Sequence, residues 1–442
     1  MLTGCKTICV FVFGFLLFGW LEAAPRIDTI EPIYLQAGKK TKVKIKGNEF
    51  KLLEWPTRIW TNHPSKWTLL EEEDNTNNQH FFEVEIAKDV PAGPLAIRAW
   101  NLKGVSKPTL AFVDVREATS FRTKNSESYE HRFQAKKGER LVCQVWSNRL
   151  NKDSDLQMTI FDPEGKTIEM IDDSEVHGSD PYVVLDPPAD GEYSLKINDI
   201  LWRDNIQACL QLSPVVEMQP EADEIPKTPA SISLDLKKGQ YLTVMPKTLE
   251  LGSPAQLLMD LHEPEGGRIA RFGNGDSLLQ PLRKKIPKDG DYHLHISDLL
   301  NREGLPYLVD ISTEAAPFEL ATTFHQDFYI TEPGKEVKIR FRVIRHQYDG
   351  PITIKSPVFE MDKAVIVEKR GDVEAVIKIP KKSRSLVVTS FYGEAEIDGQ
   401  TYRTTVDTEE PLKKTPLNMI QWPEGISGKV YFLIKSKGGM ES

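Results

Sequence analysis

The stretch VKIRFRV at residues 337–343 decides the fold class, because every second side chain in it is apolar. The same alternation occurs in KVKIK at residues 42–46. A period of two indicates a strand with one face in a core. Breaks rich in Gly, Asn, Asp and Pro recur about every ten residues, and no segment sustains an apolar helical face. The sequence therefore predicts an all-β fold of four serial β-sandwich domains.

Length and composition agree with this architecture. The chain has 442 residues, which is enough for roughly three average domains or four β-modules of about 100 residues. Its 29 Pro, 28 Gly and mean hydropathy of -0.38 exclude a polytopic membrane protein and a wholly disordered chain. The 56 Lys and Arg against 65 Asp and Glu give a net charge of -9, so the total charge does not favour nucleic acid as a partner.

The N-terminus is typical of a secretion signal. An apolar run at residues 8–21 follows Lys6 and ends at Leu21-Glu22-Ala23-Ala24, where small residues suit a signal peptidase. The run is about 14 residues, shorter than the roughly 20 that cross a bilayer as a helix, and a retained anchor is the alternative. We expect residues 1–23 to be a signal peptide. The mature chain, without an integral membrane segment, is then expected to be secreted, periplasmic or at the cell surface.

The middle of the chain contains an internal repeat. Lys136-Lys137-Gly138 recurs at residues 237–239, and Asp162-Pro163-Glu164-Gly165 recurs as EPEG at residues 263–266, both 101 residues later. DGEY at residues 190–193 and NDIL at residues 198–201 recur 99 residues later as DGDY and SDLL. Four landmarks in one order indicate two copies of one module.

The first copy closely resembles the bacterial pre-peptidase C-terminal domain. Besides the landmarks above, it carries Ser154-Asp155-Leu156, Asp172-Asp173 and Ser179-Asp180-Pro181. The resemblance implies a jelly-roll-like β-sandwich, found beside secreted peptidases and in large bacterial surface proteins. It covers residues 117–215, and residues 228–314 are a degenerate copy that keeps the turns and loses most acidic positions.

The flanking segments are expected to add two further sandwiches. Residues 25–115 resemble immunoglobulin-like domains of the TIG (IPT) type, through IEP at residues 30–32, VKIKGNEF at residues 43–50 and VPAG at residues 90–93. Strand alternation continues in residues 317–442, which carry no family signature. Between the two copies, residues 214–229 contain four prolines and several acidic side chains, so we expect an exposed linker there.

The chain lacks the sequence motifs of common enzymes. Neither Gly-x-Ser-x-Gly nor His-Glu-x-x-His occurs, and no glycine-rich phosphate loop follows a strand. We therefore expect a non-catalytic secreted binding, adhesion or scaffold protein of the bacterial cell envelope, whose partner is an envelope protein or polysaccharide. The alternatives are an accessory chain of a secreted peptidase and a hydrolase with an unrecognised site. Oligomeric state and ligand identity stay open.

Clustered tryptophans suggest a ligand platform in the first module. Trp55, Trp60 and Trp67 fall within thirteen residues of one another. Exposed indole rings in such a group bind sugar rings, whereas buried ones fill the core of a small sandwich. The core interpretation is favoured.

Two cysteines, Cys143 and Cys209, remain once the signal peptide is removed. Cys143 shares a strand face with Leu141 and Val145, so it is expected to point into the core. Cys209 shares a face with Gln207 and Gln211 and is expected to point outward. A disulfide requires Cβ atoms about 3.8 Å apart that face each other, so two free thiols are favoured over a bond.

The acidic residues of the first copy suggest a calcium site. Asp155, Asp172, Asp173 and Asp180, together with Asp153, have no acidic counterparts in the second copy. Oxygen ligands gathered by loops suit Ca²⁺, and some relatives of the family bind calcium. The alternative, which is favoured, is that these side chains form turns. No other cofactor is expected.

Overall fold

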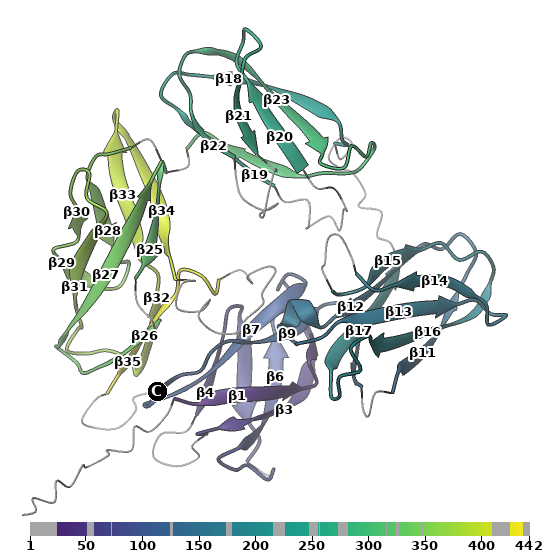
Figure 1. Cartoon of the computed structure of the whole chain (residues 1–442). Coiled ribbons are helices and arrows are strands. Elements are labelled where there is room, and N and C mark those ends of the chain that lie inside the picture. Colours follow the sequence, from purple (N-terminus) through teal and green to yellow (C-terminus); the bar gives the residue numbers. More distant parts are fainter. Residues whose placement is uncertain are drawn as a thin grey trace, which may run out of the picture.

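The computed structural model describes residues 24–50, 57–71, 73–123, 127–173, 179–214, 226–246, 255, 257–272, 282–314, 316–323, 327–346, 348–408 and 425–435. In these ranges the secondary structure is strand apart from one turn of 3-10 helix, η1 (Asn148–Leu150), which confirms the all-β prediction (Figure 1). The expected signal peptide, Trp55 and most of the expected linker lie outside the described residues. Of that linker, Pro226 and Lys227 are exposed whereas Thr228 is buried.

The first module is a sandwich of two sheets. One sheet has the order β1 (Arg26–Glu31), β3 (Lys40–Asn48), β6 (Gln79–Ile86), β5 (Ser65–Leu69). The other has the order β2 (Tyr34–Gln36), β9 (Thr109–Asp114), β7 (Gly93–Asn101), β4 (Arg58–Thr61), with β8 (Gly104–Val105) paired to β7. Alternate residues such as Val43 and Ile45 are fully buried between the sheets, as the KVKIK pattern predicts.

The second module is again a two-sheet sandwich. Its sheets have the orders β10 (Thr119–Arg122), β17 (Gln207–Pro214), β12 (Leu141–Trp146), β15 (Tyr182–Leu185) and β11 (Tyr129–Ala135), β16 (Gly191–Asp199), β13 (Leu156–Phe161), β14 (Thr167–Ile171). The repeated Tyr193 is fully buried in the core, and its hydroxyl donates to the carbonyl of Ala189 at 2.7 Å. The landmark tyrosine therefore anchors both a core and a turn.

In its described residues, the third module repeats this strand order with one strand fewer. Its sheets have the orders β18 (Ala230–Leu236), β23 (Gly290–Asp298), β20 (Leu257–His262), β21 (Arg268–Phe272) and β22 (Leu282–Lys285), β19 (Tyr241–Pro246), β24 (Val309–Ser312). Among the described residues, no strand is equivalent to β10. Instead the amide of Thr228 donates to Leu305 at 2.9 Å, as the amide of Thr123 donates to Ile206 at 3.0 Å in the second module. The two modules are structural copies.

The fourth module contains an eight-stranded sheet that curls back on itself. Its order is β29 (Glu360–Asp362), β31 (Asp372–Lys378), β27 (Glu336–Arg345), β25 (Phe318–Thr322), β34 (Gln400–Asp407), β33 (Tyr392–Ile397), β28 (Ile352–Lys355), β30 (Val365–Ile366). The edge strands β29 and β30 are consecutive in the chain, so the two edges lie close together. A small sheet of β26 (Phe328–Thr331), β35 (Val430–Ile434) and β32 (Leu386–Thr389) contributes Phe432 to the core, where it packs against Phe391.

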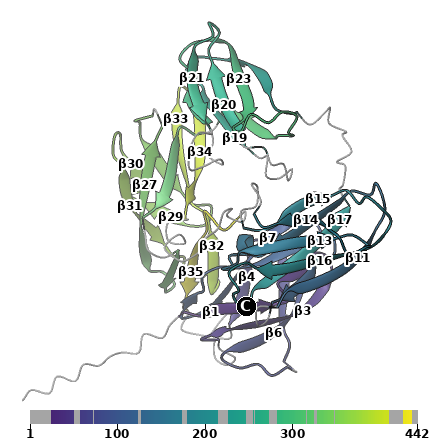
Figure 2. The same ribbon diagram turned by 45° about the vertical axis from the view of Figure 1, so that its right-hand side comes forward.

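The modules do not form an extended string. Figures 1 and 2 show the second and fourth modules beside the first, and the third module beside the fourth. One buried cluster joins Tyr34 and Phe112 of the first module to Leu150 and Cys209 of the second. Another joins Trp100 of the first module to Tyr431 and Leu433 of β35. The chain therefore folds back, and β35, the last strand among the described residues, packs on the first module.

Candidate functional site

The described tryptophans of the expected platform lie apart. Trp60 is on β4 and Trp67 is on β5, which belong to different sheets of the first module. Both are half-buried: the ring of Trp60 meets Tyr431 edge-on at 5.1 Å, and that of Trp67 meets Phe82 edge-on at 5.7 Å. The structure therefore places Trp60 at a module junction and Trp67 against the core.

Asp180 was expected to be a calcium ligand, but hydrogen bonds within the protein occupy its carboxylate. Its side chain is fully buried, and Oδ1 accepts from the amides of Ser147 at 3.0 Å and Asn148 at 2.7 Å. Oδ2 accepts from the amide and Nε of Arg149 at 2.9 and 3.0 Å. Four protein donors occupy this carboxylate, so it holds the η1 turn in place, as the turn-forming alternative supposes.

The remaining acidic residues are near one another but form no closed site. Burial and the carboxylates of Asp173, Asp199 and Asp172 raise the pKa of Asp155, which places these groups within electrostatic range. In the described ranges no three His, Cys, Asp or Glu side chains come together as a metal-binding group. Residues 174–178, beside Asp173, are outside those ranges. The calcium site stays a prediction for Asp155, Asp172 and Asp173.

An Asp–Arg pair that the sequence interpretation overlooked recurs in both copies. Asp199, which is 5% exposed, accepts from the amide, Nε and Nη2 of Arg203 at 2.9, 3.1 and 2.8 Å. Asp298 receives the same three donors from Arg302 at 3.2, 2.9 and 3.0 Å. Each pair closes the turn after β16 or β23 and presents an exposed apolar residue, Leu201 or Leu300. The repeated Asp with Arg four residues later was the available signal.

The cysteines are both free and both fully buried. Cys143 belongs to the core of the second module, where burial raises its pKa to about 12. Cys209 points to the other face of β17, as expected, but the first module covers that face. The outward face of Gln207, Cys209 and Gln211 is therefore an interface.

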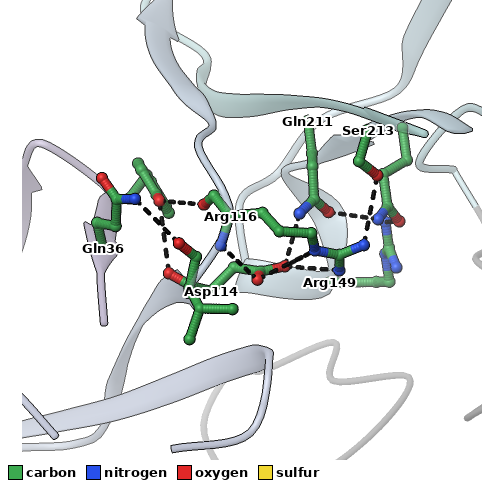
Figure 3. Close-up of polar contacts among 9 residues, drawn as sticks. Gln36, Asp114, Arg116, Arg149, Gln211 and Ser213 are labelled. Atoms are coloured by element: carbon green, nitrogen blue, oxygen red, sulfur yellow. Dashed lines mark hydrogen bonds and ion pairs between the residues drawn. The ribbon is translucent and has the colours of Figure 1, made fainter. Parts of the chain in front are cut away.

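A partly buried polar network joins the first two modules (Figure 3). Asp114 at the end of β9 accepts from Nη2 of Arg116 at 2.7 Å and from Nε2 of Gln211 at 2.6 Å. The amide oxygen of Gln211 accepts from Gln144 at 2.6 Å, and Nη1 of Arg116 donates to Ser213 at 3.3 Å. Burial alone would raise the pKa of Asp114, but the hydrogen bonds from Arg116 and Gln211 outweigh it and lower this pKa. The junction thus stabilises an ionised carboxylate.

A second buried network joins the first and fourth modules. Arg98 on β7 is 2% exposed and forms a bidentate ion pair with Asp327, whose side chain is 6% exposed. Nε of Arg98 donates to the carbonyl of Ser106 at 2.7 Å, and its guanidinium lies 4.4 Å from the ring centroid of Tyr431. A bidentate guanidinium–carboxylate pair fixes both distance and orientation. The fourth module is therefore held at a defined position on the first.

Comparison with known proteins identifies one module. Residues 131–199, from β11 to the end of β16, match the bacterial pre-peptidase C-terminal domain. This confirms the resemblance in the second module, which is a pre-peptidase C-terminal domain. The first module is a sandwich of two sheets, as predicted, and its immunoglobulin-like type stays a prediction. No curated protein matches the sequence.

Several solved structures show weak similarity to the chain. The BSP domain of a biofilm-associated protein is 8% identical with a TM-score of 0.20, covering 87% of this chain and 94% of that one. The insect immune protein hemolin is 10% identical with a TM-score of 0.21, covering 87% and 98%. Tripeptidyl peptidase 2 is 8% identical with a TM-score of 0.17, covering 95% and 40%. Such TM-scores carry no argument about function.

The chain is a multi-domain protein of β-sheet modules, and its second module matches the bacterial pre-peptidase C-terminal domain. No helix among the described residues is long and apolar enough to span a membrane. Asp180, the two Asp–Arg pairs and the two networks between modules are engaged in turns and junctions. Their arrangement holds modules in place.

Proposed function

We propose that this chain is a non-catalytic scaffold of the bacterial envelope that holds four β-modules in fixed positions and binds an envelope protein or polysaccharide. The proposal includes export by the N-terminal segment and takes the four groups of strands as the folding units. The Arg98–Asp327 pair carries the proposal. It joins two residues that are 229 positions apart in sequence and is almost completely removed from solvent.

A buried ion pair across a module boundary supports fixed positions for a physical reason. Domains tethered by linkers move relative to one another unless their interface is large and apolar. Separation of these modules would have to break a desolvated charge pair and expose the cluster around Trp100 and Tyr431. Removing one partner from such a pair typically costs about 3–5 kcal/mol. Rigid presentation of several surfaces is the property that a scaffold needs.

The test of this function is binding without turnover. The purified chain is mixed with sedimented cell-wall polysaccharide and, separately, with detergent-extracted envelope proteins, and is screened against peptidase and glycosidase substrates. We expect saturable binding to one fraction and no turnover. Robust turnover that a single side-chain substitution abolishes would contradict the proposal, as would the absence of binding to both fractions.

The match at residues 131–199 favours a second candidate, an accessory chain of a secreted peptidase. The name of that domain associates it with peptidases. If the chain has this role, the immobilised chain should capture a peptidase from the culture medium of its source. The captured material should then have a peptidase activity that the chain alone lacks. Retention of polysaccharide without peptidase activity would favour the scaffold.

A further inference from the structure

Three histidines of the third module lie together on one face of a sheet. His293 and His295 are two residues apart on β23, so their side chains point to the same side of the strand. His262 of the neighbouring strand β20 lies directly opposite His293. The ring of His295 meets that of His262 edge-on with centroids 4.8 Å apart, and it lies 6.4 Å from the ring of His293. Pairing of β20 with β23 therefore gathers rings that no sequence motif unites.

The face that carries these rings is open to solvent. His293 and His262 are half-buried and His295 is exposed, in alternation with the buried core positions of their strands. The opposite sheet of the module is the one that contacts the fourth module, through Tyr241 of β19 and Arg283 of β22 (Figure 1). Dissolved ions therefore reach the histidine face.

Ring nitrogens of two histidines are available as ligands. Nδ1 of His262 lies 3.0 Å from the carbonyl oxygen of Gly266. Because a carbonyl only accepts, Nδ1 carries the proton and Nε2 keeps its lone pair. A hydrogen bond of this kind from one nitrogen of an imidazole is usual when the other nitrogen binds a metal. In the described ranges, the ring of His295 has no hydrogen-bond partner.

No excess of positive charge opposes a cation on this face. Its strands carry the carboxylates of Asp235, Asp260 and Asp291 and the guanidinium groups of Arg268 and Arg271. Lys237 pairs with Asp235 at 2.8 Å, and at the turn after β20 one lysine, Lys288, pairs with both Glu263 and Glu265. Asp260, directly opposite His295, accepts from Nε and Nη2 of Arg271 at 2.6 and 2.5 Å. This carboxylate is therefore engaged, and the imidazoles are the groups left to bind a metal.

Two imidazoles bound to one ion have a characteristic separation. With metal–nitrogen distances of about 2.0–2.1 Å and ligand angles of about 90–110°, their centroids lie roughly 4.5–5.2 Å apart. The rings of His262 and His295, at 4.8 Å, fall in this range, and the ring of His293, at 6.4 Å from His295, does not. No group of three such side chains closes around one point in the described ranges, so the site has two protein ligands.

The second module shows that the fold itself does not require these rings. Its strands β13 and β16 pair in the same register, and Phe161 and Lys196 take the places of His262 and His295. The two imidazoles are therefore not needed to build the sheet.

We propose that His262 and His295 bind one divalent transition-metal ion, such as Zn²⁺ or Cu²⁺, through imidazole nitrogens. Imidazole suits these ions, whereas Ca²⁺ and Mg²⁺ take oxygen ligands. Two protein ligands leave the other coordination positions of the ion open to water or to a donor from a second molecule. The inference depends neither on the proposed envelope partner nor on the expected calcium site.

Isothermal titration calorimetry of the full chain with zinc chloride tests the proposal. The double variant with His262→Gln and His295→Gln should bind one equivalent of Zn²⁺ fewer, and each single substitution should weaken this site at least about tenfold. His131→Gln, which removes a half-buried histidine from β11 of the second module, is the matched control and should bind as the unchanged chain does. Binding should weaken from about pH 7.5 to about pH 5.5, because imidazole binds a metal in its neutral form.

Pulsed electron paramagnetic resonance with one equivalent of Cu²⁺ identifies the ligands. The spectrum of the unchanged chain should show modulation from the remote nitrogen of a coordinated imidazole, and the double variant should show less. Circular dichroism checks each fold. If the double variant misfolds, His295→Lys, which introduces the residue found at this position in the second module, replaces it. Absence of Zn²⁺ binding by the unchanged chain, equal Zn²⁺ equivalents in the histidine variants, or equal nitrogen modulation would overturn the proposal.

Discussion

Single side chains at the junctions are buried polar groups whose partners come from a neighbouring module. Gln211 is fully buried, and its amide connects Gln144 of its own module to Asp114 of the first. Leaving such a group without a partner costs about 1–3 kcal/mol. The junction is therefore specific as well as cohesive, since only one relative position satisfies these hydrogen bonds.

His80 is a buried polar residue of a different kind, and it predicts a pH dependence. It is 1% exposed between Phe50 and Phe82, and neither ring nitrogen has a hydrogen-bond partner among the described residues. Burial lowers its pKa from 6.5 to about 4. As the pH falls, His80 takes up a proton in the unfolded chain before it does so in the folded chain. The free energy of unfolding therefore has its full value above pH 6.5 and decreases by on the order of 3 kcal/mol as the pH falls towards 4.

Amide hydrogen exchange measures this effect locally. Protection of β6, corrected for the intrinsic pH dependence of exchange, should fall between pH 6.5 and 4 in the native chain. The variant His80→Phe keeps a ring between Phe50 and Phe82 without a titrating group, so its protection should change much less over this range. An equal loss of protection in both proteins would show that another group controls the transition.

At the scale of elements, the two copies differ in what their sheets face. β17 is buried on both sides, because its inner face packs in the second module and its outer face packs on the first. β24, its counterpart, carries exposed positions such as Ile311 at 36%. The Asp–Arg turns, by contrast, occur in both copies. They therefore stabilise the fold of each module and are not specific to the contact with the first module.

The Asp–Arg turn permits a matched test within one molecule. Asp199→Asn removes a charge that receives three donors from Arg203, so the turn after β16 should open more readily. Loss of about 1.5 kcal/mol corresponds to roughly tenfold faster amide exchange in the segment 191–206. Asp298→Asn should have the same effect on the segment 290–305, and each variant is the control for the other. If both variants alter both segments, or neither segment, the local role assigned to the pair is wrong.

Sequence patterns predict the strands and the repeated module, but they do not predict the contacts between modules. Alternation predicts strands because it reports a local period, and the repeated turns predict two modules of one strand order. The sequence pattern predicts that the face of β17 with Gln207 and Gln211 is exposed to solvent. The pattern is the same whether a polar side chain contacts water or another module. The pairing of Arg98 with Asp327 and the curling of the eight-stranded sheet depend on residues far apart in sequence, so no local pattern contains them.

In the whole molecule, the fourth module closes onto the first. β35, the last strand among the described residues, lies beside the first module (Figures 1 and 2). It places Tyr431 beside Arg98 and Trp60. Asp327 precedes β26, which lies beside β35, so one small sheet supplies both the charge and the aromatic ring of the junction. The first and fourth modules are thereby joined by contacts that a linear chain of domains lacks.

The most direct test of this closure is the distance between spin labels on the first and fourth modules. Lys39→Cys and Lys335→Cys place labels on exposed turns, with Cys5 and Cys9 replaced by serine. Cys143 and Cys209 are buried with raised pKa values, so they should resist labelling. Double electron–electron resonance should give one narrow distance distribution, which Asp327→Ala broadens by leaving Arg98 buried without its carboxylate. A broad distribution in the chain that retains Asp327, unchanged by this substitution, would contradict a fixed arrangement.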